Sequence, residues 1–221
     1  ASATSQLIDR LISNYFPEEV VQVVQGDGKT AEELLQNSFD HIFFTGGGGI
    51  GRKVMKQAAK NLTPITLELG GKSPAIVLEG ADLDITAKRL IWGKGLNSGQ
   101  TCIAPDHLLI QESLEPLILE RMKCTIKSFY GEDPLNSKHL GRIINRHHFD
   151  RLKNLLDNAK KEDQVIFGGN FDEAKRKISP TLIQIENRED PIMQEEIFGP
   201  LIPILKIKGL ENGIEEIRKS P

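Results

Sequence analysis

The sequence has few cysteines, no long apolar run and no large excess of charge, and each absence excludes a class of protein. Two cysteines, Cys102 and Cys124, are too few for a disulfide framework and are typical of a reducing compartment, so we predict a cytoplasmic protein. No run approaches the roughly 18–20 apolar residues that span a bilayer, which argues against a membrane segment in this chain. The net charge of −3, from 28 basic and 31 acidic residues, provides no positively charged surface for nucleic acid.

Other absences concern the organisation of the chain. The first ten residues are polar and lack the basic-then-apolar pattern of a signal peptide. There is neither an internal repeat nor a low-complexity segment. The sequence starts at Ala1, partway into a helical pattern, which we interpret as a truncation. What remains is an ordinary globular composition, 38% hydrophobic and 27% charged, in 221 residues, enough for one large domain or two small ones.

Short β-rich runs alternate with helical patterns, which predicts a parallel α/β sheet. Strands are predicted over residues 20–24, 41–44, 65–69, 75–78, 107–111, 165–167, 181–185 and 201–207. Helices are predicted over residues 7–15, 30–37, 51–60, 83–96, 114–128, 146–160 and 210–219. Thr30 and Glu33 are predicted to form a capping box at the start of the second helix. The Gly70-Gly71 and Ser73-Pro74 pairs are the candidate boundary between two lobes.

A glycine-rich loop, GGGGIG at residues 46–51, lies between a predicted strand and a predicted helix. It satisfies the pattern G-x-G-x-x-G at Gly46, Gly48 and Gly51. Glycines let the backbone approach a pyrophosphate, and the helix N-terminus supplies free N–H groups. The pattern also fits a βα turn with no ligand, and on the usual dinucleotide rule the acid that binds ribose would be Glu68.

Cys102 and Glu68 form the candidate catalytic pair. Cys102 lies in SGQTCIAP at residues 98–105, and Glu68 lies in LELGG at residues 67–71. A thiol attacks at neutral pH only when a neighbour deprotonates it or stabilises the thiolate, and an acyl-enzyme is opened only by an activated water. Taken alone, Cys102 could instead be a small buried residue and Glu68 a solvated residue of a strand. The apolar neighbours of Glu68 predict a half-buried carboxylate, and Cys124, at helical spacing with Leu117, is predicted to lie in the core.

Three segments together resemble the signature segments of aldehyde dehydrogenases: LELGGKSP at residues 67–74, SGQTCIAP at residues 98–105 and EEIFGP at residues 195–200. The surrounding residues resemble the class 3, fatty-aldehyde branch: HIFFTG at residues 41–46, NLTPIT at residues 61–66 and CIAPD at residues 102–106. The resemblance runs from about Ser5 to Pro221. It implies an aldehyde dehydrogenase-like α/β fold, with a partial Rossmann-type dinucleotide-binding lobe over residues 1–70 and a nearly complete catalytic lobe over residues 71–221.

The resemblance also implies the chemistry, which is oxidation of an aliphatic or aromatic aldehyde to a carboxylic acid with NAD or NADP. Cys102 corresponds to the nucleophile, which forms a thiohemiacetal and then a thioester. Glu68 corresponds to the general base that activates water, and we therefore reject it as the ribose acid. In this interpretation Lys72 is structural or solvated.

The cofactor residues are carried over from the same resemblance. Gly46, Gly47 and Gly51 correspond to the phosphate-binding loop, Glu196 to the residue that binds the nicotinamide ribose, and Phe198 to the residue that packs against the nicotinamide ring. The family usually has a serine where this chain has Gly47, so we expect one phosphate contact fewer.

The match covers only the middle of the family pattern. The upstream segments with a second oxyanion donor and an adenosine-ribose site do not occur in these residues, nor does the tail that packs subunits into the family's homodimer. We therefore expect a central fragment that is inactive when isolated. The alternatives are a non-catalytic remnant that binds a partner, and a cysteine hydrolase without cofactor, for which the sequence near Cys102 offers no convincing histidine partner. No metal site is expected, because His147 and His148 have no further ligand at suitable spacing.

Overall fold

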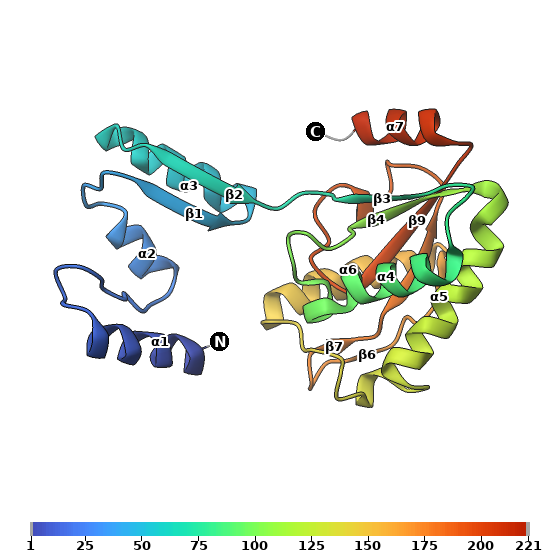
Figure 1. The fold of residues 1–221 in the computed structure, drawn as a ribbon, viewed down its shortest axis with the longest axis horizontal. Coiled ribbons are helices and arrows are strands. Elements are labelled where there is room, and N and C mark those ends of the chain that lie inside the picture. The colour runs from blue at the N-terminus through green and yellow to red at the C-terminus, as the bar shows by residue number, and fades with distance from the viewer. Residues whose placement is uncertain (1, 220–221) are drawn as a thin grey trace. The chain divides into compact units, whose positions relative to one another are not determined.

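The computed structural model describes residues 2–219 and divides into two compact units, Ala1–Leu69 (unit 1) and Gly70–Pro221 (unit 2) (Figure 1). Each unit is described by itself. Within residues 2–219, every helix is too short or too polar to cross a membrane.

Unit 1 is a small β–α–β unit preceded by two helices. Its elements are α1 (Ser2–Tyr15), α2 (Gly28–Leu34), β1 (Ile42–Gly46), α3 (Gly48–Ala58), the 3₁₀ turn η1 (Ala59–Asn61) and β2 (Ile65–Leu69). The strands β1 and β2 pair in parallel, and α3 connects them. Of the helices, α3 buries Gly51, Val54 and Ala58, at the i, i+3 and i+7 spacing of one helix face, whereas α1 and α2 bury no residue. The core of unit 1 is therefore thin.

In unit 1, the predicted strand at residues 20–24 and the predicted capping box are wrong. Residues 20–24 form no strand, and Val20 and Val24 are 68% and 55% exposed. A β-rich run becomes a strand only when another strand pairs with it, and no described strand lies beside this one. The second helix begins earlier than predicted, because Asp27 caps it by accepting hydrogen bonds from the backbone N–H groups of Lys29 and Thr30. Thr30 thus lies inside the first turn, and the predicted capping box does not form.

Unit 2 is built on a five-stranded sheet with the order β3-β4-β9-β8-β5. The strands are β3 (Pro74–Val77), β4 (His107–Gln111), β9 (Leu201–Ile207), β8 (Thr181–Ile185) and β5 (Val165–Phe167). The first four are parallel, as predicted, but β5 is antiparallel to β8 at the edge. A hairpin of β6 (Phe171–Asp172) and β7 (Lys177–Ile178), which was not predicted, follows β5.

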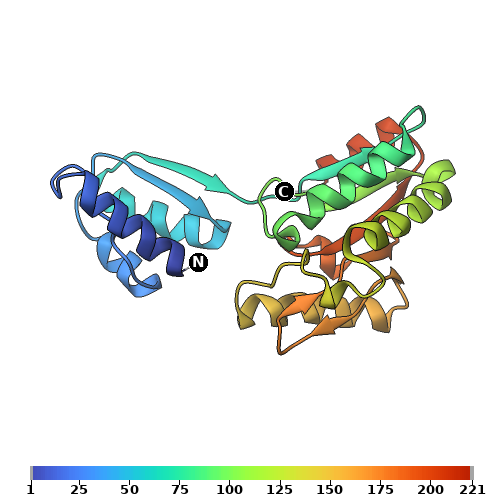
Figure 2. The ribbon, with the colours of Figure 1, turned by 60° about the horizontal axis from the view of Figure 1, so that its bottom comes forward.

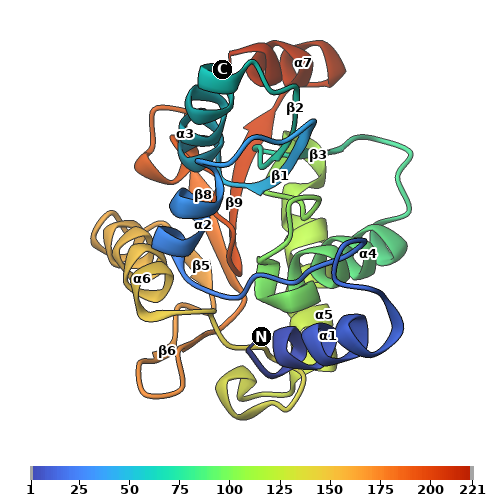
Figure 3. The same cartoon turned by 90° about the vertical axis from the view of Figure 1, so that its left-hand side faces the viewer.

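Four helices cover the two faces of this sheet. They are α4 (Leu83–Gly95), α5 (Glu115–Tyr130), α6 (Arg146–Lys161) and α7 (Leu210–Arg218), and the 3₁₀ turns are η2 (Leu96–Gly99), η3 (Glu112–Leu114), η4 (Pro134–Asn136) and η5 (Pro191–Met193). The helices α4 and α5 lie side by side against one face (Figure 2). On the other face α6 packs on the sheet (Figure 3). The β6–β7 hairpin contacts α6 through the rings of Phe171 and Phe149, whose centroids are 6.2 Å apart.

The alternation of side chains along β4 explains why unit 2 has two core layers. Leu108 and Ile110 belong to the cluster under α4 and α5, and Leu109 between them belongs to the cluster under α6. All three are fully buried, because successive side chains of a strand point to opposite faces and both faces are covered. Unit 2 therefore has a substantial core that can hold loops at its edges in fixed positions.

Candidate active site

The turn that carries Cys102 follows α4 and reverses the chain within a few residues. Asn97, Ser98 and Gly99 have positive φ angles of 51°, 55° and 75°. A Cβ atom on Gly99 would lie 2.2 Å from the carbonyl oxygen of Gly199, so this close approach requires glycine. The backbone then closes a turn with a hydrogen bond from the Ala104 N–H to the Thr101 oxygen, 3.0 Å long.

A buried glutamine fixes this turn. The Gln100 Oε1 accepts a hydrogen bond from the Ile144 N–H at 2.9 Å, and its Nε2 donates to the carbonyl oxygens of Asn97 and Arg142 at 2.9 and 3.0 Å. The Cys102 thiol itself is exposed. The structure therefore presents the predicted nucleophile to solvent on a turn that is held from behind. Sequence reasoning did not assign this role to Gln100, although it stands inside the SGQTC segment.

The prediction that Cys124 lies in the core is wrong, because Cys124 is exposed. The buried stripe of α5 includes Ile118, Met122 and Ile126, spaced four residues apart. Each residue of a helix turns the side chain by about 100°, so Cys124 lies about 200° from Met122, on the solvent side.

Glu196 is half-buried beside the Gly70-Gly71 pair within unit 2. A Cβ atom on Gly70 would lie 1.9 Å from the Glu196 Oε2, so a side chain at this position would displace the carboxylate. Burial raises the pKa of Glu196, while a hydrogen bond from the Gly71 N–H to the carboxylate opposes that rise. Phe198, two residues on, is half-buried and has a positive φ of 47°.

A buried ion pair between Lys72 and Asp106 lies behind Glu196, with side chains only 11% and 4% exposed. Burial alone would raise the pKa of Asp106, but the neighbouring His107 ring and two lysine ammonium groups hold it below its ordinary value. Lys94 is also buried, and desolvation lowers its pKa to about 8. Of the two alternatives given for Lys72, the structure shows the structural one.

In unit 1, the glycine loop and Glu68 lie at the same end of the parallel pair of strands. The register pairs Thr45 with Glu68 and Gly46 with Leu69, at the carboxyl ends of β1 and β2. Glu68 is exposed, so the expected half-buried carboxylate is not seen in this unit. The structure thus brings Glu68 near the glycine loop, and it brings the Cys102 turn near the segment that carries Glu196 and Phe198.

The glycines of the loop have different surroundings. Gly47 caps α3 without a side-chain hydrogen bond, and a Cβ atom there would have no neighbour within 4 Å. A Cβ atom on Gly51 would lie 2.8 Å from the Leu69 Cδ2, so Gly51 allows α3 to pack closely against β2. A Cβ atom on Gly46 would meet the ring of Phe44 at 2.6 Å.

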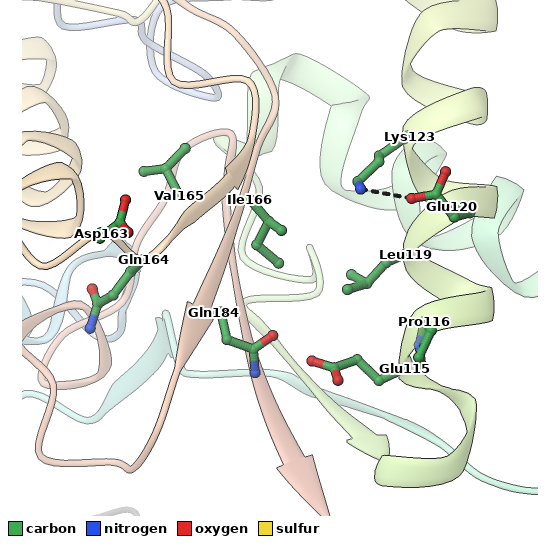
Figure 4. Close-up of a pocket in the computed structure, with 10 residues that line it drawn as sticks. All are labelled: Glu115, Pro116, Leu119, Glu120, Lys123, Asp163, Gln164, Val165, Ile166 and Gln184. Atoms are coloured by element: carbon green, nitrogen blue, oxygen red, sulfur yellow. Dashed lines mark hydrogen bonds and ion pairs between the residues drawn. The ribbon is translucent and has the colours of Figure 1, made fainter.

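A separate hollow of about 430 Å³ lies between α5 and β5 and contains none of the residues singled out from the sequence (Figure 4). The side chains of Glu115 and Gln184 point toward one another across it, and Leu119 faces Ile166 (Figure 4). Neither Cys102 nor Cys124 lines it, so we do not take it as the candidate active site.

The family model described as "Aldehyde dehydrogenase family" matches residues 1–221. The chain belongs to this family. It is 46% identical over 215 residues to the dimeric, NADP-preferring aldehyde dehydrogenase of Rattus norvegicus, covering 97% of this chain and 47% of the relative. It is 44% identical over 214 residues to aldehyde dehydrogenase family 3 member A2 of Rattus norvegicus, covering 97% of this chain and 43% of the relative. The predicted family and its class 3 branch are confirmed.

Among solved structures, the chain is similar to the substrate-bound aldehyde dehydrogenase AldH of Staphylococcus aureus. The TM-score is 0.93 at 40% sequence identity, and the match covers 98% of this chain and 47% of the other. The predicted α/β aldehyde dehydrogenase-like fold is therefore confirmed. The chain spans somewhat less than half the length of the relatives it matches.

Proposed function

We propose that this chain carries the nucleophile and the general base of an aldehyde dehydrogenase that uses NAD or NADP. The observation that supports this most directly is the exposed thiol of Cys102 on a turn anchored by Gln100. The same turn touches Gly199, next to the segment of Glu196 and Phe198. The Cys102 thiol and the half-buried Glu196 carboxylate thus belong to one compact unit, unit 2.

The residues of unit 1 fit a dinucleotide. Gly47 leaves the first turn of α3 without a side-chain cap, and the space beside it is open, so backbone N–H groups remain for phosphate oxygens. We propose that Gly46, Gly47 and Gly51 form this loop, that Glu196 binds the nicotinamide ribose hydroxyls and that Phe198 packs on the nicotinamide ring. When bound, NAD or NADP accepts the hydride that leaves the substrate.

The side chains of this protein perform the remaining steps. The Cys102 thiolate adds to the aldehyde carbon and forms a C–S bond, and the carbonyl oxygen becomes an oxyanion that the Cys102 backbone N–H stabilises. Loss of hydride from the same carbon leaves a thioester. Glu68 removes a proton from water, the hydroxide attacks the thioester carbon, and the carboxylic acid leaves as the Cys102 thiolate is restored.

Glu68→Gln tests this assignment in a protein that carries these residues together with the flanking segments of the family. The amide cannot accept the proton from water, so steady turnover falls by about 10²–10⁴. The initial burst of reduced cofactor, measured by stopped-flow absorbance, is kept. Cys102→Ser abolishes both phases, and Cys124→Ser, as the matched control, changes neither.

Other results would contradict the proposal in distinguishable ways. Loss of the burst in Glu68→Gln would mean that Glu68 deprotonates Cys102 or holds the cofactor. Ester cleavage by Cys102 with no oxidation in the presence of NAD or NADP would favour a cysteine hydrolase. A protein that neither binds nucleotide nor reacts with aldehyde would be a non-catalytic remnant.

We further propose that the complete protein forms a homodimer and is cytoplasmic. The name of the rat relative describes that enzyme as dimeric. The cytoplasmic assignment is supported by the two cysteines, which are free in the structure.

A further inference from the structure

Residues 194–198, called here the Glu196 segment, carry both side chains proposed to contact the nicotinamide end of the cofactor. The segment joins η5 to β9 and has neither helical nor strand structure. A backbone that lacks the regular hydrogen bonds of a helix or a sheet keeps its shape only when other groups bond to its N–H and C=O groups. Three charged side chains from distant parts of unit 2 do this: Lys72, Asp106 and Arg151.

Lys72 uses its ammonium group to connect the buried ion pair with the segment. Its Nζ donates to the Asp106 carboxylate, to the carbonyl oxygen of Glu195 at 2.9 Å and to that of Ile192 at 3.3 Å. An ammonium group has three hydrogens, so these acceptors occupy all of them. Lys72 is therefore fixed and cannot turn toward a ligand without breaking these bonds.

Asp106 and Arg151 hold the next peptide groups from two sides. The Asp106 Oδ1 accepts a hydrogen bond from the Ile197 N–H at 2.8 Å. The Arg151 guanidinium donates to the carbonyl oxygens of Ile197 at 2.5 Å and Glu196 at 3.4 Å. The peptide groups on both sides of Glu196 are thus bonded to charged groups, which make stronger hydrogen bonds than neutral ones.

The carboxylate of Glu196 is fixed separately, by the pair of glycines that precedes Lys72. Gly71 donates its N–H to the carboxylate, and Gly70 leaves the room that the Oε2 atom needs. Gly70 and Gly71 therefore hold the side chain of Glu196, and Lys72 holds the carbonyl oxygen of the preceding residue, Glu195.

We propose that Lys72, Asp106 and Arg151 are positioning residues that set the orientation of the Glu196 carboxylate and the Phe198 ring for the cofactor. The proposal rests on the function proposed above. Replacing a buried ion pair by apolar residues is often neutral or stabilising, so stability alone does not explain why the buried Asp106 and the partly buried Lys72 and Arg151 all bond to one irregular segment. Their separate hydrogen bonds to successive peptide groups define one geometry, which an apolar cluster of the same volume would not.

The first test uses the unaltered 221-residue chain and measures amide hydrogen exchange by NMR. The Ile197 amide, bonded to a buried carboxylate, is expected to exchange as slowly as the amides of β9. Exchange as fast as that of an exposed loop amide would overturn the proposal. This measurement needs no variant and no cofactor.

The second test uses Arg151→Lys, which keeps the charge but cannot bond two carbonyl oxygens with a rigid planar group. We expect Ile197 exchange to become about tenfold faster, the factor that corresponds to the loss of one hydrogen bond of the segment. We also expect the pKa of Glu196, read from its carboxyl ¹³C shift, to change, because the carboxylate loses its fixed position beside Gly71 and Arg151. Arg121→Lys, on the exposed Arg121–Asp84 pair, is the matched control and should change neither. An unchanged Glu196 pKa in Arg151→Lys would contradict the proposal.

A cofactor titration separates this inference from the proposed function. If NAD binds to the unaltered chain, Arg151→Lys and Glu196→Gln should weaken binding by similar factors, and the double variant should be no weaker than either. Fully additive losses would overturn the positioning role. If NAD does not bind, the NMR measurements still decide the positioning role, and only the proposed function is affected.

Discussion

Cys102 and Cys124 are both exposed, so solvent access does not distinguish the proposed nucleophile from the other thiol. We expect iodoacetamide to alkylate both in the folded chain, which peptide mapping would show. In Cys124→Ser, labelling should be confined to Cys102. Protection of Cys102 in the folded state would contradict its exposed position. Activity measurements on this family member should therefore be made in the Cys124→Ser background.

Lys94 links stability to pH. Its side chain is buried, and desolvation lowers its pKa from 10.5 to about 8. Below about pH 8 the ammonium group is charged in both the folded and the unfolded state, so the full burial penalty, about 3 kcal/mol, is present. As the pH rises from 8 toward 10.5, the folded state loses the proton first and the penalty disappears.

We therefore expect Lys94→Met to raise the free energy of unfolding at pH 7, by up to about 3 kcal/mol. Its advantage over the unaltered chain should shrink as the pH rises to 10. Urea unfolding of both proteins across this range is the measurement. An advantage that does not change with pH would mean that Lys94 is not charged in the folded state at pH 7.

The site residues divide into those that a local pattern indicates and those that only packing brings together. Cys102 and Glu196 stand in short segments whose glycines and prolines already indicate tight turns. The sequence could not predict that Asp106 and Arg151 both bond to Ile197, because only the tertiary fold brings α6 and the residue before β4 to this segment. The burial of Lys94 was equally hidden, since a lysine in a helix is ordinarily solvated.

At the scale of elements, the contact between the Cys102 turn and residue Gly199 can be tested by substitution. In Gly99→Ala the new Cβ would lie 2.2 Å from the Gly199 oxygen at a residue with positive φ. Gly80 also has positive φ, but a Cβ there would meet nothing within 4 Å, so Gly80→Ala is the matched control for backbone strain. We expect Gly99→Ala to destabilise unit 2 by about 1–3 kcal/mol more than Gly80→Ala. Equal thermal unfolding of the two variants would contradict the close approach.

The strands were predicted well where a short apolar run lies close to a proline or a glycine that marks one of its ends. The predicted bounds of β2, β4, β5, β8 and β9 agree with the structure. The direction of β5 could not be predicted, since composition does not specify how an edge strand pairs. The β6–β7 hairpin has two residues a strand, too few for any periodicity. Residues 20–24 show the opposite failure, a strong β pattern without a partner strand.

At the scale of the whole molecule, the two units differ in how much they bury. In unit 1, α1 exposes Leu7, Ile8, Leu11 and Tyr15. A hollow of about 910 Å³, largely apolar, lies between α2, β1 and α3. The two-stranded sheet of unit 1 is at the lower limit of independent stability. Unit 2 has two continuous core clusters.

We therefore expect limited proteolysis to remove unit 1 first and to leave a resistant product that begins near Gly70, identified by mass spectrometry.

The exposed apolar surface of unit 1 also favours self-association, so the purified chain should sediment partly as aggregates. Calorimetry should show weak or no binding of NAD or NADP. A monodisperse chain with micromolar affinity for either nucleotide would contradict these expectations.

The position of β9 has a consequence for biosynthesis. This strand lies between β4 and β8, yet it comes last of the five along the chain. While the ribosome is still making residues before 201, β3 can pair with β4 and β8 with β5, but the two pairs have no strand to join them. The nascent chain must therefore wait, with two hydrophobic strand edges open to chaperones, until β9 leaves the exit tunnel. Folding of unit 2 is thus completed only after the seven residues of β9 have been made.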